Sequence, residues 1–542
     1  MTQRSAGRTL RSTTRTVTGP LTGAAAGLLA AAMALGAAQL VAGITGPGGV
    51  PVIAVGSAAI DLTPVPVKDF AIQHFGRDDK LVLLSGIVVV LAVFAAVTGI
   101  MAMRRRVFGL LGLAVFGAIG VAAVLSRPVA RPVDVVPTLV GVAAGALALA
   151  LLVRAATGPG GASARAAARS TADVVAVGTP APENAAAQPG RRRFLLAAAG
   201  TAAVAAIGAG VGEVLLRRFN VASARALVTL PRPSISGPGT PSAAQLPVPG
   251  ISSFITPNAS FYRVDTALTL PQVPPEQWRL RVHGMVAKEL DLTFEDLLKR
   301  PLTEADITIA CVSNQVGGPY VGNARWLGAS LAALLREAGV RRGADQILST
   351  SSDGWTCGTP AEAVMDGRNA LLAVGMNGQP LPVAHGFPAR MVVPGLYGYV
   401  SATKWVVDLE VTTFAARQSY WAQRGYTPQA PIKTESRIDV PKPLQQVKAG
   451  RTAVAGVAWA PHRGIDRVQV RADGGTWHDA KLAAVPGLDT WRQWVWPWDA
   501  TPGLHQLEVR ATDGTGAIQP SRRVPIFPNG ATGWDSVSVT VT

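Results

Sequence analysis

Long apolar segments dominate the N-terminal part of the chain and set its organisation. Five of them stand apart from the polar sequence around them, and each has about the 20 residues that cross the hydrocarbon core of a bilayer. They are Leu21–Ile44, Leu81–Met103, Val107–Leu125, Val135–Val153 and Phe194–Leu216. The first four contain no charged residue, which matters because one charge at the bilayer centre costs about 2.5–3.5 kcal/mol. The pattern predicts an α-helical membrane region, residues 1–217, with five transmembrane helices.

Basic residues are distributed unevenly among the segments that join these helices. One side of the membrane receives Arg4, Arg8, Arg11, Arg15, Arg104, Arg105, Arg106, Arg154, Arg165, Arg169, Arg191, Arg192 and Arg193. The other side receives a smaller set, Lys68, Arg77, Lys80, Arg127 and Arg131. Because basic loops stay in the cytoplasm, we expect a multi-pass protein of the cell membrane with a cytoplasmic N-terminus and everything after the fifth helix outside the cytoplasm.

The fifth helix carries a second signal at its start. Arg191-Arg192-Arg193-Phe194-Leu195, followed by small apolar residues, resembles a twin-arginine export signal, which suits a domain exported folded with its cofactor. The alternative is an ordinary basic flank of a transmembrane helix. The preceding stretch, Ala155–Gly190, is rich in Ala, Gly and Pro and predicts a flexible cytoplasmic linker.

Histidine usage limits what the membrane helices hold. A b-type haem in a helical bundle usually needs two axial histidines, and His74 is the only histidine before residue 220. No haem is therefore expected in this chain. An external cytochrome or a quinone stays open as electron partner, beside the simpler interpretation that the helices only anchor the protein.

The remainder of the chain alternates short strands, helices and turns. Residues 218–250 are rich in Pro, Ser and Gly and predict a linker leaving the membrane. In residues 251–425, Trp278–Val282 and Ile307–Ala310 predict strands and Thr293–Lys299 a short helix, which together indicate an α+β domain. Residues 432–542 hold alternating strands such as Arg467–Ala472 and His505–Ala511, separated by Asp-Gly turns, and predict an immunoglobulin-like all-β sandwich.

Composition and charge agree with this organisation. The chain has 542 residues, room for three or four domains, and only 15% of them are charged. The formal net charge of +17 raises the question of nucleic acid. Much of the basic excess lies in loops that the predicted topology already explains, and no zinc spacing or phosphate-binding glycine loop appears. Nucleic acid is therefore not expected as a partner.

Cys311 is the residue around which candidate chemistry gathers. It follows the β-branched run that ends at Ala310, precedes a loop with Gly317-Gly318, and beyond that loop the sequence predicts a helix rich in Leu and Ala. The chain has two cysteines, so outside the cytoplasm Cys311 and Cys357 are candidates for a disulfide. The alternative is that Cys311 is a thiolate ligand of a redox-active metal. From spacing alone, both interpretations stand.

Three blocks of sequence resemble the sulfite oxidase family. ITPNASFYRVDTAL (Ile255–Leu268) resembles its opening, ITIACVSN around Cys311 its molybdenum-binding segment, and MNGQPLPVAHGFPARMVVPGLYGYVSATKW (Met376–Trp405) its most distinctive run. In that family one cysteine thiolate joins the two dithiolene sulfurs of molybdopterin on the metal. The resemblance implies a molybdenum–molybdopterin cofactor with Cys311 as its protein ligand. It also implies that the C-terminal domain serves in homodimerisation.

The same resemblance assigns the cofactor-binding residues. His385 and Arg390 are implied to reach the pterin and its phosphate. Since Gly and Pro separate them, the two should come from a loop and the strand that follows. The other implied contacts are Asn258, Tyr262, Arg263, Val264, Asp265, Thr266, Ser351, Asp353, Ala402, Thr403 and Lys404. Three keep a structural alternative, namely a packed aromatic for Tyr262, a turn for Asp353 and a solvated Lys404. Arg325, in NARW, is a catalytic candidate for the substrate side of the metal.

Two positions depart from the family pattern. Val264-Asp265 replaces a basic, histidine-containing pair, so a negative charge stands near the expected substrate pocket and weakens the case for an anionic substrate such as sulfite. Cys357 aligns where vertebrate members carry a tyrosine close to the metal.

The sequence thus predicts a membrane-anchored molybdopterin oxidoreductase that transfers oxygen on a small, sulfur-containing substrate outside the cytoplasm. The alternatives are an S- or N-oxide reductase of the same family, or a non-enzymatic binding module in which Cys311 pairs with Cys357.

Overall fold

A computed structural model describes residues 18–75, 79–157 and 189–542. Arg4–Arg15, Arg77 and almost all of the predicted linker Ala155–Gly190 lie outside the described residues. The chain divides into two compact units, Met1–Asn220 and Val221–Thr542. Each unit is described by itself.

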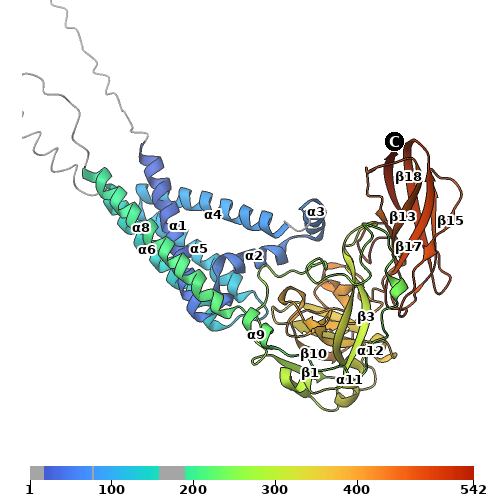
Figure 1. The fold of residues 1–542 in the computed structure, drawn as a ribbon. Helices are drawn as coiled ribbons and strands as arrows, with labels where there is room; N and C mark the ends of the chain where they lie inside the picture. Colours follow the sequence, from blue (N-terminus) through green and yellow to red (C-terminus); the bar gives the residue numbers. More distant parts are fainter. Residues whose placement is uncertain (1–17, 76–78, 158–188) are drawn as a thin grey trace, which may run out of the picture. The chain divides into compact units, whose positions relative to one another are not determined.

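The first unit is built from long helices that follow the predicted apolar segments (Figure 1). Five of its helices are long and apolar enough to cross a membrane: α1 (Thr18–Thr45), α4 (Asp79–Arg104), α5 (Arg106–Leu125), α6 (Val136–Thr157) and α8 (Pro189–Leu216). All five predicted helices are confirmed as helices. Helix α1 lies at the centre and packs against α4, α6 and α8.

Glycines allow these helices to approach closely. A Cβ at Gly27 would collide with the backbone of α4, one at Gly36 with α8, and one at Gly141 with α1. Small residues at helix contacts are typical of packing inside a bilayer, where lipid is as apolar as leucine and only close contact favours association. On the outer side, Val89, Val90 and neighbouring apolar residues of α4 are exposed. This exposure suits a lipid surface better than water.

Two helices between α1 and α4 were not predicted. They are α2 (Pro51–Leu62) and α3 (Val65–Phe75), in a stretch treated as a connecting loop. Helix α2 has 12 residues, too few to cross a bilayer. Pro51 is the first residue of α2, a position where its missing N–H costs nothing. The proline therefore starts a helix here, although it was taken as part of a loop.

The second unit begins with a segment that is packed where a spacer was expected. Val221 is buried against the oxidoreductase core and precedes α9 (Ala222–Leu227). The Arg225 guanidinium donates to the carbonyls of Leu381 (2.7 Å) and Pro380 (2.6 Å). Part of the predicted linker 218–250 is thus held on the domain surface by hydrogen bonds to backbone carbonyls. Such bonds cannot be predicted from the pattern of hydrophobic residues.

The oxidoreductase part, up to about residue 425, contains two five-stranded sheets and three short helices. One sheet has the order β2 (Leu290–Thr293), β1 (Arg279–Gly284), β10 (Val406–Thr412), β5 (Gln346–Ser351), β6 (Thr356–Pro360). The other contains β3 (Leu302–Ala310), β4 (Val321–Ser330), β7 (Leu371–Met376), β8 (Gln379–Pro380) and β9 (Arg390–Val392). The helices are α10 (Phe294–Leu298), α11 (Leu331–Ala338) and α12 (Ala361–Met365). The predicted strands and the short helix capped by Thr293 are confirmed.

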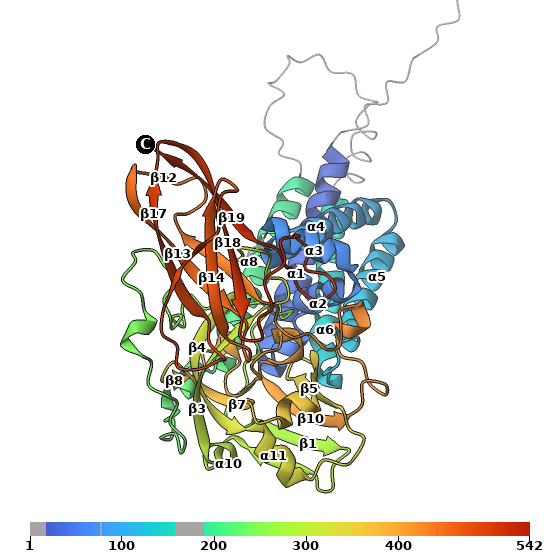
Figure 2. The same cartoon turned by 90° about the vertical axis from the view of Figure 1, so that its right-hand side faces the viewer.

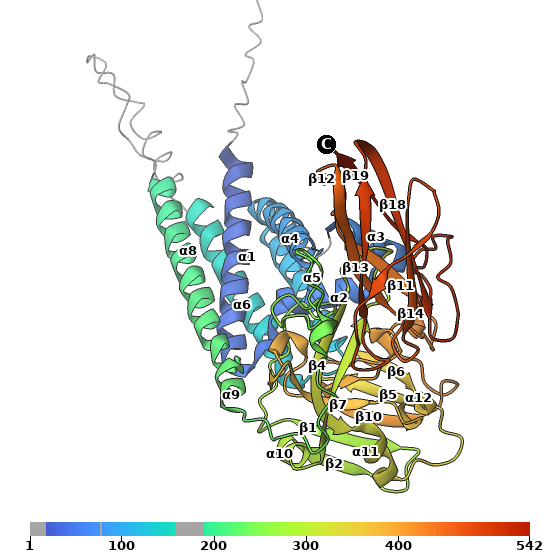
Figure 3. The same cartoon turned by 45° about the vertical axis from the view of Figure 1, so that its right-hand side comes forward.

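The C-terminal part is a sandwich of two sheets. One has the order β11 (Glu435–Val440), β13 (Gly450–Trp459), β17 (Arg492–Ala500), β16 (Lys481–Leu482). The other has β12 (Gln446–Val447), β19 (Asp535–Val541), β18 (Gly503–Asp513), β14 (Ile465–Ala472), β15 (His478–Asp479). Figures 2 and 3 show the two sheets beside each other. Their facing side chains, among them Trp494, Val468 and Leu507, form one core. The all-β prediction is confirmed, and its immunoglobulin-like label stays a prediction.

Candidate active site

Cys311 lies in a tight loop directly after β3. Its N–H donates to the Tyr320 carbonyl (2.9 Å), and Asn314 closes the loop by donating its own N–H to the Cys311 carbonyl (3.0 Å). The Cys311 Sγ is 2.8 Å from the Ser313 hydroxyl. Burial raises the pKa of the thiol, while Ser313 and the charge of Lys404 lower it. The loop therefore presents one sulfur beside positive charge.

The disulfide considered from the sequence does not form. Both cysteines are free, Cys311 half-buried and Cys357 fully buried on β6. Cys357 lies opposite Ser349 in the β5–β6 pair, and its neighbours are Thr359 and Thr403. The pairing of β5 with β6 fixes the position of Cys357. The number of cysteines in the sequence could not show this pairing.

The opening block packs against the loop that contains His385. Asn258 accepts a hydrogen bond from the Asn377 side-chain amide (2.8 Å), and its carbonyl is 3.3 Å from His385 Nε2. The Tyr262 ring stacks on Phe261. Burial raises the pKa of Tyr262, and the nearby Cys311 adds to this shift while Arg390 opposes it. Tyr262 therefore lies close to both Cys311 and Arg390.

A cluster of charges forms where this block meets the chain before β10. The Arg263 guanidinium donates two hydrogen bonds to Asp265 (2.8 and 3.0 Å), and Lys404 Nζ donates to the same carboxylate (2.7 Å) and to the Val264 carbonyl (3.0 Å). Asp265, expected to add negative charge to the pocket, is thus held by two cations. Thr266 follows, half-buried, in a bend.

His385 and Arg390 come from the elements expected of them. His385 ends a short 3-10 turn, η6 (Val383–His385), and Arg390 begins β9. Gly386 between them has φ +107, and a Cβ there would collide with Lys404. The turn between His385 and Arg390 therefore requires glycine at this position. Burial and the charges of Arg390 and Lys404 lower the pKa of His385 to about 4. The imidazole is therefore neutral near pH 7.

Arg390 is buried without a carboxylate. Its guanidinium donates to the carbonyls of His385 (3.1 Å) and Ala402 (3.3 Å) and lies over the Trp326 ring at 5.0 Å. Burial lowers its pKa to about 10. Among the described residues no ion pair of Arg390 is present. A buried cation with neutral partners is costly, and an anionic group would offset that cost.

Residues 402–404 complete the basic site. The Thr403 hydroxyl is 2.7 Å from the Ser349 hydroxyl, and both side chains are buried. Burial lowers the pKa of Lys404 to about 8, with Asp265 acting in the opposite direction and Arg390 adding to the lowering. With 11% of its side chain exposed and a carboxylate partner, Lys404 is paired rather than freely solvated.

Ser351 and Asp353 follow β5 beside this segment. Ser351 pairs with Val406, is almost fully buried, and its hydroxyl has no hydrogen-bond partner in the described part of the chain. Such an unpaired buried hydroxyl points to a partner outside the protein. Asp353 accepts a hydrogen bond from the Trp355 N–H (3.2 Å), which makes it a turn residue as well.

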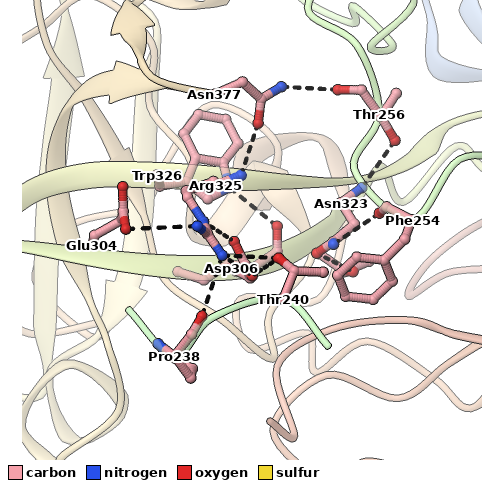
Figure 4. A network of polar contacts seen from close by, with 12 residues as sticks. Pro238, Thr240, Phe254, Thr256, Glu304, Asp306, Asn323, Arg325, Trp326 and Asn377 are labelled. Carbon is pink, nitrogen blue, oxygen red and sulfur yellow. Dashed lines mark hydrogen bonds and ion pairs between the residues drawn. The ribbon is translucent and has the colours of Figure 1, made fainter. Parts of the chain in front are cut away.

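Arg325 is not brought to Cys311. It lies on β4 opposite Asp306, which is five residues before Cys311 along β3, roughly 16 Å at strand spacing. Figure 4 shows its guanidinium in a network with Asp306 (2.8 Å), Glu304 (3.8 Å), Thr240 and Pro238. The next residue, Trp326, points to the opposite face, toward Arg390, because side chains alternate along a strand. The structure gives Arg325 an acidic partner on β3, and its assignment to the substrate side of the metal stays a prediction.

Asn377 is a supporting residue that the sequence did not single out. Its side chain accepts from the Arg325 N–H (2.9 Å) and donates to Thr256 O (2.9 Å), as Figure 4 shows. It also donates to Asn258 Oδ1 (2.8 Å). Asn377 and Gly378 both have positive φ in the turn between β7 and β8. An Asn-Gly pair is a known signal for such a turn, so the position was recognisable.

Comparison with known proteins agrees with this arrangement. A family model described as oxidoreductase molybdopterin binding domain matches residues 267–421. Sulfite oxidase of Gallus gallus is 31% identical over 327 residues, which cover 51% of this chain and 70% of that protein. The chain belongs to the sulfite oxidase family. Mitochondrial sulfite oxidase of Rattus norvegicus is also 31% identical, over 51% of this chain, and the match spans 59% of the rat protein's length.

Among solved structures, the sulfane dehydrogenase SoxCD of Paracoccus pantotrophus matches at 26% identity and a TM-score of 0.47, covering 53% of this chain and 83% of that one. The domain match and the sulfite oxidase relatives together support a molybdenum-dependent oxidoreductase with a molybdenum–molybdopterin cofactor.

The residues present fit that cofactor. The pyranopterin ends in a phosphate, and the buried Arg390, Lys404 and the unpaired Ser351 hydroxyl offer cationic and polar partners for an anion. Cys311 offers one free sulfur. Within the described residues, no group of three or more His, Cys, Asp or Glu side chains is placed to hold a metal by itself. A metal that receives most of its ligands from the cofactor and one from Cys311 agrees with both observations.

Proposed function

We propose that this chain is a membrane-anchored molybdopterin oxidoreductase that transfers an oxygen atom to a small sulfur-containing substrate, with sulfite as the leading candidate. The observation that carries this proposal is the free Cys311 thiol near Arg390, a buried cation without a carboxylate, and Lys404, which shares its one carboxylate with Arg263. The absence of a disulfide favours the enzyme over the non-enzymatic binding module.

Each part of the site has a distinct task in this proposal. Arg390, Lys404 and Ser351 hold the cofactor phosphate, His385 and Asn258 line the pterin, and Cys311 is the protein ligand of the metal. The bound cofactor supplies the two-electron redox chemistry and the oxygen atom that is transferred. A neutral His385 donates or accepts a hydrogen bond without adding charge, so the phosphate is balanced by the arginine and the lysine.

Arg263 is the candidate for contact with the substrate. About a third of its side chain is exposed, and its guanidinium is oriented by Asp265. Because Lys404 shares that carboxylate, Arg263, Asp265 and Lys404 together carry one net positive charge. A net positive rim favours an anion such as sulfite. Since Asp265 engages Arg263 directly, a neutral S- or N-oxide, reduced in the opposite direction, is the second candidate substrate.

The anchoring and orientation are also proposals. Five apolar helices with exposed valines and glycine contacts support a membrane domain. The excess of arginine on one side supports a cytoplasmic N-terminus, an extracytoplasmic active site and export by the twin-arginine route. An external cytochrome or quinone would accept the electrons, and the C-terminal sandwich would form a homodimer.

Metal content tests the central claim. Full-length protein from a host able to supply the cofactor should contain close to one molybdenum and one pterin per chain by mass spectrometry. The Cys311→Ser variant should lose or alter the molybdenum signal, and Cys357→Ser, a matched change at the other cysteine, should retain it. Molybdenum-free parent protein would contradict the proposal.

Substrate direction is tested next on the loaded enzyme. Sulfite oxidation with ferricyanide and sulfoxide reduction with reduced viologen are assayed side by side. Turnover of sulfite alone supports the oxidase, whereas turnover of the sulfoxide alone moves the assignment to the reductase.

A further inference from the structure

The Cys311 loop rests on the first strand of the C-terminal sandwich. Arg437 on β11 donates to the Gly318 carbonyl (2.8 Å), at the far end of the loop. Two residues earlier on β11, Glu435 lies next to the side chain of Asn314. The sandwich therefore supplies two charged side chains directly beneath the loop that carries the metal ligand.

Glu435 and Asn314 are unusual because they are buried and incompletely paired. Glu435 is 3% exposed and Asn314 is 2% exposed. Glu435 Oε1 and Asn314 Nδ2 each have no hydrogen-bond partner of normal geometry among the described residues. Asn314 is the one side chain that lowers the pKa of Glu435 through a hydrogen bond, and burial outweighs it, so the site favours the protonated form.

The charged groups around Glu435 act in both directions. Burial raises its pKa to about 8; Asn314, Lys433 and Arg437 lower the value, and Asp535 on β19 raises it. A group with this pKa gains and loses a proton near neutral pH. None of these neighbours is a ligand in the proposed metal site.

Tyr397 lies near both this carboxyl and Cys311. Its phenol is buried, and its pKa is raised by burial and by the proximity of both Glu435 and Cys311. The Lys433 N–H is 3.5 Å from the phenol oxygen. The half-buried Lys433 ammonium donates to Asn529 Oδ1 (3.0 Å) and Gly530 O (2.6 Å). Tyr397 thus lies near both Glu435 and Cys311, and the partly exposed Lys433 lies near Glu435.

We propose that Glu435 is the proton-exchange group of the Cys311 site. This inference rests on the proposed oxidation, in which substrate and one water give the oxygenated product, two protons and two electrons. The electrons pass to an external acceptor, a cytochrome or quinone in the cell or ferricyanide in an assay. Where Glu435 is ionised, its carboxylate takes up one released proton, becomes the acid, and returns that proton to water on the Lys433 side before it takes up the second proton. Glu435 acts through Tyr397 and Asn314, so it is a positioning residue.

The test replaces Glu435 by its uncharged isostere, Glu435→Gln, in the full-length loaded enzyme. The control is Glu508→Gln, a half-buried acid on β18 that pairs with Arg471 (2.7 Å). We measure kcat for sulfite with ferricyanide from pH 6 to 9. At each pH the kcat of the parent is divided by the kcat of the variant, so the titration of sulfite itself, which affects both proteins equally, cancels. The ratio for Glu435→Gln should rise from near one at pH 6 to about tenfold at pH 9, as a lost proton acceptor predicts. Glu508→Gln should give a flat ratio.

A ratio for Glu435→Gln that stays flat, or the same slope in both variants, would overturn the inference. Molybdenum content and melting temperature of each variant exclude a folding defect as the cause of a change. A second measurement needs no turnover. The infrared band of a protonated carboxylic acid should titrate near pH 8 in the cofactor-free parent and be missing from Glu435→Gln. Its absence from the parent at neutral pH also contradicts the proposal, whereas failure of sulfite turnover in loaded parent protein contradicts only the proposed function.

Discussion

At the scale of single residues, burial of charge dominates the site. His385, Arg390 and Lys404 all have pKa values lowered mainly by burial, which means that the folded chain holds these groups at an electrostatic cost. Proteins accept such a cost at sites where a ligand offsets it. The sequence identified these three residues through family resemblance, and it gave no sign of their burial.

Arg390→Lys tests how the phosphate is held. A lysine keeps the positive charge but lacks the planar guanidinium. The guanidinium donates to the carbonyls of His385 and Ala402 and has further N–H groups for the phosphate, and an ammonium group cannot do both. We expect at least a tenfold loss of pterin and molybdenum per chain, measured by mass spectrometry. Arg492→Lys is the matched control, since Arg492 donates to the carbonyls of Ala483 and Ile465 within the sandwich. Equal cofactor content in both variants would contradict the role of Arg390.

His385 makes the stability of the cofactor-free protein depend on pH. Its pKa is about 4 in the folded chain, below the ordinary value of about 6.5, so the unfolded chain takes up its proton first as the pH falls. Stability contributed by neutral His385 is present above pH 6.5 and is lost between pH 6.5 and 4, by about 3 kcal/mol. His385→Gln should show a shallower fall of melting temperature across this window. His283→Gln, at the half-buried pair with Asp408, is the matched histidine replacement outside the site.

At the scale of secondary-structure elements, periodicity predicted the long helices and several of the strands, and failed at β4. The stretch VGNARWLGAS lacks the β-branched run that marks β3, and no strand was predicted there. In the structure the glycines of this stretch are needed because neighbouring elements come close. A Cβ at Gly322 would lie 2.8 Å from the Phe261 ring, and one at Gly328 would lie 2.5 Å from the Leu372 carbonyl. Tertiary packing, which no local pattern contains, turned this stretch into a central strand.

Gly328→Ala measures the importance of that close approach. The added methyl group has no room between β4 and β7, so the strands must separate, at a cost of about 1–3 kcal/mol. We expect the melting temperature of the oxidoreductase part to fall by several degrees. Gly239→Ala, with nothing within 4 Å of the new Cβ, should leave it unchanged. An unaltered melting temperature in Gly328→Ala would mean that the sheet adjusts freely.

At the scale of the whole molecule, the division into two units suggests that the second folds alone. Val221–Thr542 forms a compact unit with its own cores. Expressed without residues 1–220, it should remain in solution without detergent and bind the cofactor as the full chain does. Size-exclusion chromatography, with mass spectrometry for molybdenum, checks both points. Aggregation of the fragment, with the full chain monodisperse in detergent, would show that the helical unit is needed for folding.

The orientation of the helical unit has an equally direct test. In the proposed topology, the basic residues at the start of α5 and α8 lie in the cytoplasm, because the positive-inside rule acts on arginine near the ends of spanning helices. An odd number of crossings then carries the C-terminus to the opposite side. Protease added to intact spheroplasts cannot enter the cytoplasm, so it should remove an epitope tag fused after Thr542. A tag that is protected until the membrane is lysed would place the active site in the cytoplasm and remove the need for twin-arginine export.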